Sequence, residues 1–180
     1  MNAADNFQRC STMTSIKVEI NAEDNLISVY NDGDGIPIKI HEKEKVYIPD
    51  LIFGTLLTSS NFNDSERKVT GGRNGYGAKL CNIYSTEFIV ETADMDVGKK
   101  FKQVYRGNMM KRGEPKITPL PASTKNEYVK ISFKPDLQRF KMDVLDKDIV
   151  ALLSKRVYDV AGCNPTLKVF LNGKRIPVNN

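Results

Sequence analysis

The sequence predicts an α+β protein, a two-layer α/β sandwich in which a mostly antiparallel sheet carries helices on one face. Several segments alternate apolar and polar residues, as half-buried strands do, and residues 146–161 repeat apolar side chains at helical spacing. No internal repeat or low-complexity linker interrupts the order of elements. At 180 residues, the chain is long enough to bury the core of a single domain.

The elements follow one another in a simple order. Small and polar residues at the start predict the end of a helix over 2–9, a Pro-led segment predicts a short helix over 50–57, and a third helix is expected over 77–85. The polar stretch 58–70 is expected to form a lid over a ligand. Alternation predicts strands at 15–20, 26–30, 87–92, 100–106, 128–134 and 167–171.

The clearest helix is expected over 146–161. A mainly apolar stripe repeats there at helical spacing, and Gly162 follows as a residue suited to ending a helix. The stripe consists of Ile149, Leu152, Leu153, Arg156 and Val160.

The strand at 26–30 runs into the sequence NDGDGIP, which we interpret as the floor of a pocket. Asn31 offers both a donor and an acceptor to the edge of a base, and Gly33 and Gly35 let backbone approach a flat ring. The alternative is a hairpin turn, because Asp-Gly is a strong turn signal. Pro37 and the charged run 41–45 argue against an immediate return strand.

The most informative stretch is GGRNGYGAK at 71–79. Glycines that open a helix let several backbone N–H groups reach an anion, and Lys79 adds a mobile positive charge. These features favour phosphate binding over a plain glycine-rich turn. The stretch is not a Walker A loop, because Leu80 follows the lysine where that motif has Ser or Thr.

The opening residues NAADN form the third element of interest. Asn2 and Asn6 are four residues apart, so they share one face of a helix. Taken alone, an Asn-rich N-terminus is more often a frayed end than a site.

The order NAADN, NDGDGIP, LLTSSN and GGRNGYGAKLCNIYS resembles the ATPase domain of eukaryotic type II DNA topoisomerases. These enzymes share a superfamily with gyrase, a heat-shock chaperone, histidine kinases and a mismatch-repair protein. The resemblance extends to VFLNGK at 169–174 and thus covers nearly the whole chain. It implies a Bergerat-type ATP-binding fold, with residues 1–175 as an ATP-binding domain that lacks its first segment and 176–180 as the start of a transducer domain.

The resemblance also implies roles for individual residues, with ATP and Mg²⁺ as cofactors. Asn2 matches the asparagine whose oxygen holds Mg²⁺. Asn31 stands where the wider superfamily has an aspartate that binds the adenine amino group, and an amide oxygen accepts the same hydrogen bond. The implied ribose and phosphate contacts are Ser59, Ser60 and Asn61, and the implied phosphate-wrapping turn is Gly72, Arg73, Asn74, Gly75, Tyr76, Gly77, Ala78 and Lys79.

In this family, the general-base glutamate precedes the position of Asn2 by about one helical turn, which lies upstream of Met1 here. The transducer lysine and the DNA-cleaving tyrosine belong to later regions of such proteins. We therefore expect no catalytic residue in this chain and negligible hydrolysis by it alone. Asp5 matches a different family position and is disfavoured as a substitute base.

Composition is that of a globular protein, with no signal peptide and no apolar run long enough to span a membrane. The three cysteines have no paired spacing for zinc and indicate reduced thiols in an intracellular protein, which the resemblance makes nuclear. His41, the single histidine, is expected in a solvated loop.

The net charge of +5 is only a mild excess of positive charge, and its default interpretation is a solvated surface. A cluster of basic residues allows weak phosphate-backbone contact, and the resemblance makes DNA and a second copy of the chain the partners of the full-length enzyme. The cluster shows no aromatic interleaving for base stacking. Its members are Lys99, Lys100, Lys102, Arg106, Lys111, Arg112 and Lys116.

The leading function is ATP–Mg²⁺ binding within a type II topoisomerase that passes one DNA duplex through another, where nucleotide capture closes a dimer gate. The alternative is a non-hydrolysing nucleotide-binding or interaction fragment from a truncated gene copy. A chaperone or kinase of the same superfamily is disfavoured by the GGRNGYGAK run.

Overall fold

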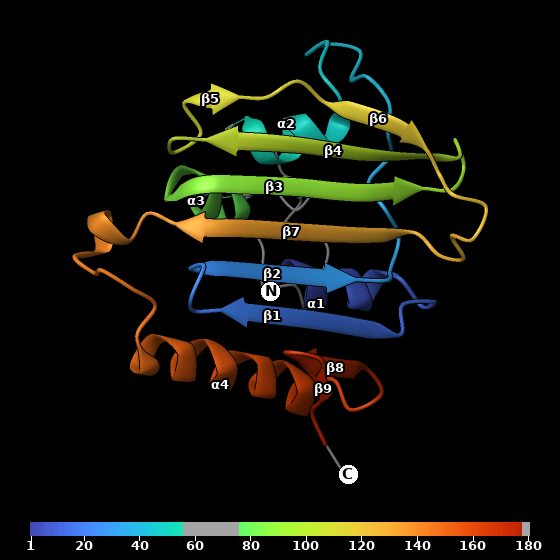
Figure 1. Ribbon diagram of the computed structural model, residues 1–180. Helices are drawn as coiled ribbons and strands as arrows, with labels where there is room; N and C mark the ends of the chain where they lie inside the picture. The colour runs from blue at the N-terminus through green and yellow to red at the C-terminus, as the bar shows by residue number, and fades with distance from the viewer. Residues whose placement is uncertain (56–75, 178–180) are drawn as a thin grey trace, which may run out of the picture.

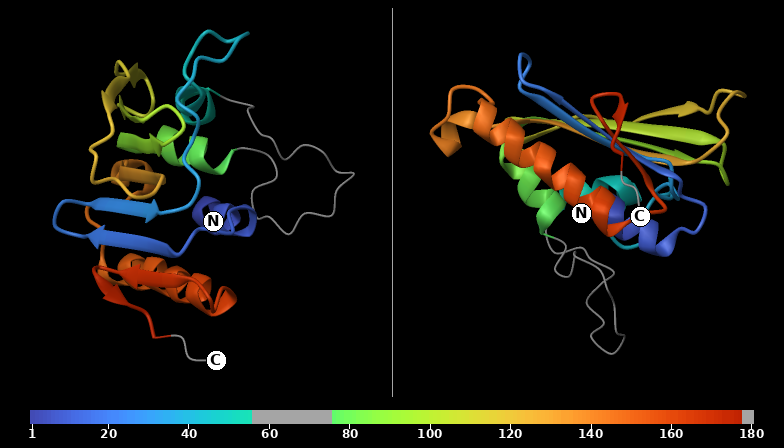
Figure 2. Two further views of the ribbon diagram at one scale, coloured as in Figure 1. Left: turned by 90° about the vertical axis from the view of Figure 1, so that its right-hand side faces the viewer. Right: turned by 90° about the horizontal axis from the view of Figure 1, so that it is seen from below.

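A computed structural model describes residues 1–55 and 76–177. Within this part, a nine-stranded sheet forms one layer and four α-helices cover one of its faces (Figures 1 and 2). The predicted fold class is therefore confirmed.

The helices of the described residues are α1 (Asn2–Arg9), α2 (Ile48–Gly54), α3 (Gly77–Ile83) and α4 (Lys147–Cys163), with a 3₁₀ turn at Leu137–Phe140. The strands are β1 (Ser15–Asn21), β2 (Leu26–Asn31), β3 (Ser85–Asp94), β4 (Lys99–Arg106), β5 (Lys111–Arg112), β6 (Lys116–Pro119), β7 (Tyr128–Pro135), β8 (Lys168–Leu171) and β9 (Lys174–Arg175).

The sheet runs in the order β5-β4-β3-β7-β2-β1-β8-β9, and β6 pairs with β4 beside β5. Among the described strands, β1 and β8 alone pair in parallel, and the other pairs are antiparallel. The parallel pair needs a crossover, which α4 supplies before the chain enters β8. The last described strands therefore lie against the first strand of the chain.

Helix α4 departs from its predicted end and face. Gly162 lies inside the helix, and Asn164 ends it by donating its side-chain Nδ2 to the carbonyl of Val160 (2.8 Å). The predicted stripe included Leu152, which is 51% exposed, whereas Val157 and Ala161 are buried. The buried stripe is thus rotated from the expected one, because contact with β8 and the start of the chain, rather than apolar content alone, decides which face turns inward.

The six predicted strands are present within a few residues of their expected ends, but β5, β6 and β9 were not predicted. Each has only two to four residues, which is too short for alternation to be recognised. They form only because β4 and β8 offer free edges for pairing.

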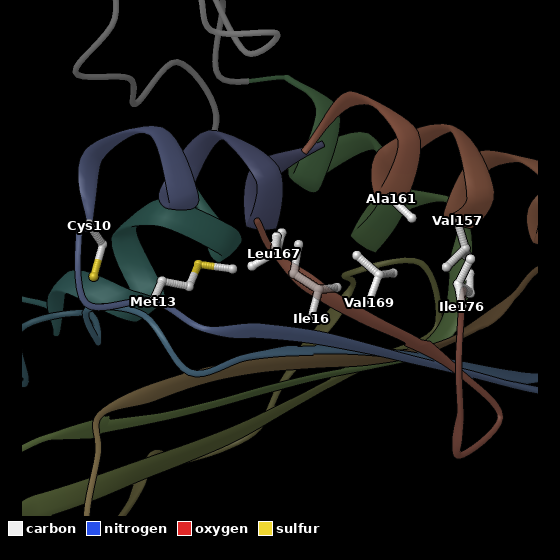
Figure 3. Close-up of a cluster of buried hydrophobic side chains, with 8 residues drawn as sticks. All are labelled: Cys10, Met13, Ile16, Val157, Ala161, Leu167, Val169 and Ile176. Carbon is white, nitrogen blue, oxygen red and sulfur yellow. The ribbon is translucent and has the colours of Figure 1, made fainter. Parts of the chain in front are cut away.

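One buried cluster joins the two ends of the described chain (Figure 3). Side chains from the α1–β1 connection and β1 pack there against α4, β8 and the residue after β9, Ile176. Its members are Cys10, Met13, Ile16, Val157, Ala161, Leu167, Val169 and Ile176. The division of the chain at residue 175 into two domains stays a prediction.

Asp32 follows β2 and fastens the connection between α1 and β1. Its two carboxylate oxygens accept four hydrogen bonds, from the backbone N–H and hydroxyl groups of Thr14 (2.9 and 2.6 Å) and Ser15 (2.7 and 2.9 Å). Partial burial acts to raise the pKa of Asp32, but these hydrogen bonds outweigh it, so the pKa lies below its ordinary value.

We expect Asp32→Asn to lower the free energy of unfolding at neutral pH by about 1–3 kcal/mol, because the amide cannot accept all four bonds. A carboxyl with a lowered folded-state pKa stabilises the fold above its unfolded pKa of about 3.9, and that contribution disappears as pH falls through the folded pKa. Denaturant unfolding from pH 7 to pH 2 should therefore show the two proteins converging in acid. Asp143→Asn, at an exposed position, serves as the matched control. A constant difference at all pH values would contradict this role.

Candidate functional site

The chain from Asp32 to Ile38 leaves β2 and crosses the helical face without joining a strand. Side chains from distant segments bind its backbone instead. Glu127 Oε2 accepts from the N–H of Gly35 (2.6 Å), Thr92 Oγ1 from that of Ile36 (2.9 Å) and Asp94 Oδ2 from that of Ile38 (2.8 Å). The predicted hairpin alternative is thus absent, and the segment is held against the end of β3.

Asn31, the last residue of β2, is buried on the helical side of the sheet beside α1. Its Oδ1 accepts from Asn6 Nδ2 (3.0 Å) and from the N–H of Gly33 (3.3 Å), and Asn6 Nδ2 also donates to the carbonyl of Asp34 (3.2 Å). An adenine amino group that bonds to the Asn31 oxygen must therefore share or replace one of these donors.

Asn6 was not predicted as a site residue, although its spacing from Asn2 placed both on one helix face. The contact with Asn31 spans 25 residues, so helical spacing alone could not reveal it. Asn2 lies one turn before Asn6, on the same face of α1, and is exposed.

The two glycines after Asn31 are explained by contacts within the protein. A Cβ at Gly33 would lie 2.8 Å from Asn6 Nδ2 and 3.0 Å from Met13 Sδ. A Cβ at Gly35 would lie 1.9 Å from the carbonyl oxygen of Ala93, a backbone atom that has little freedom to move. Close packing at the end of β2 therefore requires glycine at both positions, and the approach of a flat ring to this segment stays a prediction.

Lys79 lies in α3 and is only 2% exposed, although it carries a charged head group. Burial lowers the pKa of Lys79, because the ammonium is less well solvated than in water. An anion close to this ammonium would favour the charged form and raise the pKa again. Such a group suits a site that receives phosphate.

The same helix carries residues of the GAKLCNIYS run whose roles are structural. Burial raises the pKa of the Cys81 thiol to about 12, so it is not a nucleophile at neutral pH. Asn82 is fully buried and donates Nδ2 to the carbonyl of Phe53 (3.1 Å), which ties α3 to α2. Its Oδ1 has no hydrogen-bond partner among the described residues.

Helix α3 packs on β3 and β7, whereas α1 packs on β2, and β7 and β2 are neighbours in the sheet. The two helices therefore cover adjacent strands on the same face (Figures 1 and 2). This arrangement places Asn2, Asn6 and Asn31 on one side of the candidate site and Lys79 on the other.

Other expected site residues lie outside the described part of the chain. They are Ser59, Ser60, Asn61, Gly72, Arg73, Asn74 and Gly75. Tyr76, Gly77 and Ala78 are described at the start of α3, with Tyr76 and Gly77 exposed.

Within residues 1–55 and 76–177, no helix has the length and apolar character of a membrane span. The same residues contain no group of three or more His, Cys, Asp or Glu side chains arranged for a metal ion. All three cysteines are free thiols, as expected. His41 is partly exposed in the loop before α2, where its Nδ1 accepts from the N–H of Glu44 (3.3 Å).

Comparison with known proteins gives a consistent picture. Residues 1–138 match the family model described as histidine kinase-, DNA gyrase B- and HSP90-like ATPase. The whole chain is 57% identical to the DNA topoisomerase 2 of Meyerozyma guilliermondii, of which it covers 13%. It is 59% identical to the DNA topoisomerase 2 of Caenorhabditis elegans over 99% of this chain and 12% of that protein.

The fold is also that of a solved structure. The ATPase region of Saccharomyces cerevisiae topoisomerase II superposes with a TM-score of 0.96 at 55% identity, covering 99% of this chain and 47% of that one. The chain thus spans about an eighth of the curated relatives and about half of the solved ATPase region.

We expect Gly35→Ala to destabilise the fold by about 3 kcal/mol, because the new methyl group would overlap a backbone oxygen of β3. Gly162→Ala is the matched control, since a Cβ there meets nothing within 4 Å and replaces a glycine inside α4. That variant should gain about 0.5–1 kcal/mol from better helix propensity. Chemical denaturation of both variants checks the pair, and equal changes would show that the close approach at Gly35 is unimportant.

Proposed function

The chain belongs to the ATPase region of the eukaryotic type II DNA topoisomerases, and we propose that its helical face binds ATP together with Mg²⁺. The observation that carries this proposal is the contact between Asn6 of α1 and Asn31 at the end of β2. It joins two of the three motifs that are far apart in the sequence, and α3 brings the third to the neighbouring strands.

The chemistry of the side chains fits this ligand. Mg²⁺ prefers hard oxygen ligands and usually keeps several waters while it bridges phosphates, so the single amide oxygen of Asn2 is a suitable protein ligand. Asn31 offers an amide to the edge of the adenine ring. Lys79 holds a buried positive charge, which stabilises the charge on terminal phosphates more strongly than an exposed lysine does.

Family membership supports the remaining contacts of the proposed site. We propose that Ser59, Ser60 and Asn61 bind ribose and phosphate and that the Gly72–Lys79 turn surrounds the phosphates with backbone N–H groups. Gly77 leaves that approach open, because a Cβ placed there would meet nothing within 4 Å among the described residues.

For the whole protein, we propose a DNA topoisomerase that uses this site as an ATP-operated gate, acts on DNA as a homodimer and works in the nucleus. The support is the identity of 57–59% to DNA topoisomerases 2 of a yeast and a nematode. The chain covers 12–13% of those relatives, so DNA cleavage would depend on other regions.

We further propose that a polypeptide of residues 1–180 binds ATP but hydrolyses it negligibly. General-base catalysis is worth about 10²- to 10⁴-fold, and Asp5, the acidic residue of α1, is buried at 9% exposure rather than presented to a water. The direct test is calorimetric titration with ATP and Mg²⁺ alongside a phosphate-release assay. Absence of binding by a folded chain would refute the proposed function, and rapid turnover abolished by Asp5→Ala would identify Asp5 as the base.

We expect Lys79→Met to weaken ATP by about 10- to 100-fold and ADP by much less, because a charge-assisted bond of about 1.5–3 kcal/mol depends on the terminal phosphate. In the unaltered chain, ATP affinity should also fall at alkaline pH, since the lowered pKa lets Lys79 lose its proton sooner than an exposed lysine. The variant should lack this pH dependence. Calorimetry with both nucleotides across pH measures both effects, and an equal loss for ATP and ADP would rule out contact with the terminal phosphate.

We expect Asn2→Ala to reduce nucleotide affinity in Mg²⁺ by about tenfold, or about 1.4 kcal/mol, while binding in a chelator stays nearly unchanged. The matched control is Gln8→Ala, which removes an exposed amide from the same helix. Titrations with and without Mg²⁺ separate the two variants. If removing Mg²⁺ costs the unaltered chain and Asn2→Ala the same factor, Asn2 is not a metal ligand.

A further inference from the structure

The sheet face opposite the helices carries a row of six residues in direct cross-strand register. The row crosses six strands, and each member is the pairing partner of the next. In order, it consists of Lys17, Tyr30, Lys130, Glu91, Lys102 and Lys116. We name this set the lysine row.

The lysine row points away from the hydrophobic core. Successive side chains of a strand face opposite sides, and strand neighbours of the row such as Ile16, Val90 and Phe101 are buried in the core. Figure 1 looks onto the row's face of the sheet, with α1, α2 and α3 behind it. The row and the candidate nucleotide site therefore lie on opposite faces.

Neighbouring residues of the same face add to the positive charge. By register, Arg106 pairs with Lys111 and Glu87, and Glu87 pairs with Lys134, while Lys100 lies two residues before Lys102. Counted over strands β1 to β7, this face carries eight basic residues and three acidic ones, Glu19, Glu87 and Glu91, for a net charge of +5.

The register divides the basic cluster that the sequence suggested. Lys99 and Arg112 alternate with the residues of this face, so their side chains leave the sheet on the helical side. There Arg112 forms an ion pair with Asp50 of α2 (3.1 Å). Two lysines from distant segments, Lys17 and Lys130, belong to this face although the sequence did not place them in the cluster. Tyr30 lies between them and stacks on Tyr128 at 5.6 Å, so the lysine row contains an aromatic residue that the basic cluster at 99–116 was not expected to have.

The acidic residues of this face are already bonded. Glu91 pairs with Lys102 and Glu87 with Arg106, both at 2.9 Å, and Glu19 accepts from the Ser28 hydroxyl (3.2 Å). Partly exposed pairs of this kind are weak, so they leave both basic groups available to a stronger anion. The excess positive charge is not neutralised within the face.

A shallow hollow of about 160 Å³ opens in the row at its β1 end. It is lined by Lys17, Glu19, Ser28, Tyr30 and Lys130, so two ammonium groups and the side chain of Tyr30 border it, next to the Glu19 carboxylate that accepts from Ser28. Lys17 Nζ lies 5.2 Å from the centre of the Tyr30 ring, which orients the lysine over the hollow. Such a hollow offers several donors to one phosphate group.

We propose that this open face is a docking surface for double-stranded nucleic acid, which it holds by the phosphate backbone without reading base sequence. Adjacent strands are about 4.8 Å apart, so five steps give the row a length of about 24 Å. That length corresponds to about seven base pairs at 3.4 Å each. A sheet face with excess positive charge suits a duplex backbone better than a peptide, because phosphate contacts depend on charge whereas a peptide would need pockets for its side chains.

The test is fluorescence anisotropy of a labelled 20-base-pair duplex with the chain over a range of salt concentrations. The row variant carries Lys17→Gln, Lys116→Gln and Lys130→Gln, and the control carries Lys43→Gln, Lys45→Gln and Lys147→Gln at exposed positions away from the row. Loss of three phosphate contacts should reduce the slope of log K against log salt by about 2.7, whereas the control should leave it nearly unchanged.

A third variant with arginine at the three row positions should retain the full slope, because it keeps the charges. Thermal unfolding and ATP titration of every variant show that the fold and the nucleotide site are intact, which separates failure of this proposal from failure of the proposed function. Equal losses in the row and control variants would mean that only net charge matters. Polyglutamate that competes as well as unlabelled duplex at equal charge would instead identify an acidic protein as the partner, and either result overturns the proposal.

Discussion

The arrangement of this domain depends on finding hydrogen-bond acceptors for backbone N–H groups that do not pair with a neighbouring strand. From Asp32 to Ile38 the chain crosses the helical face, and buried N–H groups there need acceptors. Carboxylates and hydroxyls from β3 and from the residue before β7 supply them, with Glu127 on Gly35 N–H and Asp94 on Ile38 N–H. Asp32 binds the α1–β1 connection in turn. Segments more than 50 residues apart are thereby fixed around the end of β2.

This network also explains how polar residues are tolerated beside the core. Asn31 is 5% exposed, and a buried amide without partners would cost a few kcal/mol. Asn6 and Gly33 bind its oxygen, and the absence of a Cβ at Gly33 lets α1 approach closely enough to do so. The packing that stabilises the fold therefore also brings together the amides proposed to bind nucleotide and metal. A change that loosens the packing would affect both.

Local signals predicted much of the fold, and contacts between distant segments account for the rest. Alternation identified β1 to β4, β7 and β8, and Asp146 was correctly placed at the start of α4, where its carboxylate accepts from two helical N–H groups. The exposed position of Leu152 and the role of Asn6 depend on which distant surface each helix meets, which helical spacing does not specify. The same holds for the lysine row, since the alignment of Lys17 with Lys130 arises only from strand register.

The two faces of the sheet differ because only one of them is covered. On the helical face, buried polar groups are held by many protein contacts, so a ligand there meets preformed amides and the desolvated charge of Lys79. On the open face, charges remain hydrated and screened, so they favour long, weakly specific contacts with a polyanion over tight binding of a small molecule. Because β2 contributes Asn31 to one face and Tyr30 to the other, a single strand lies between the two proposed sites. The covered face and the open face of this domain are thus two sides of one backbone, and burial on one side and hydration on the other decide which kind of ligand each side suits.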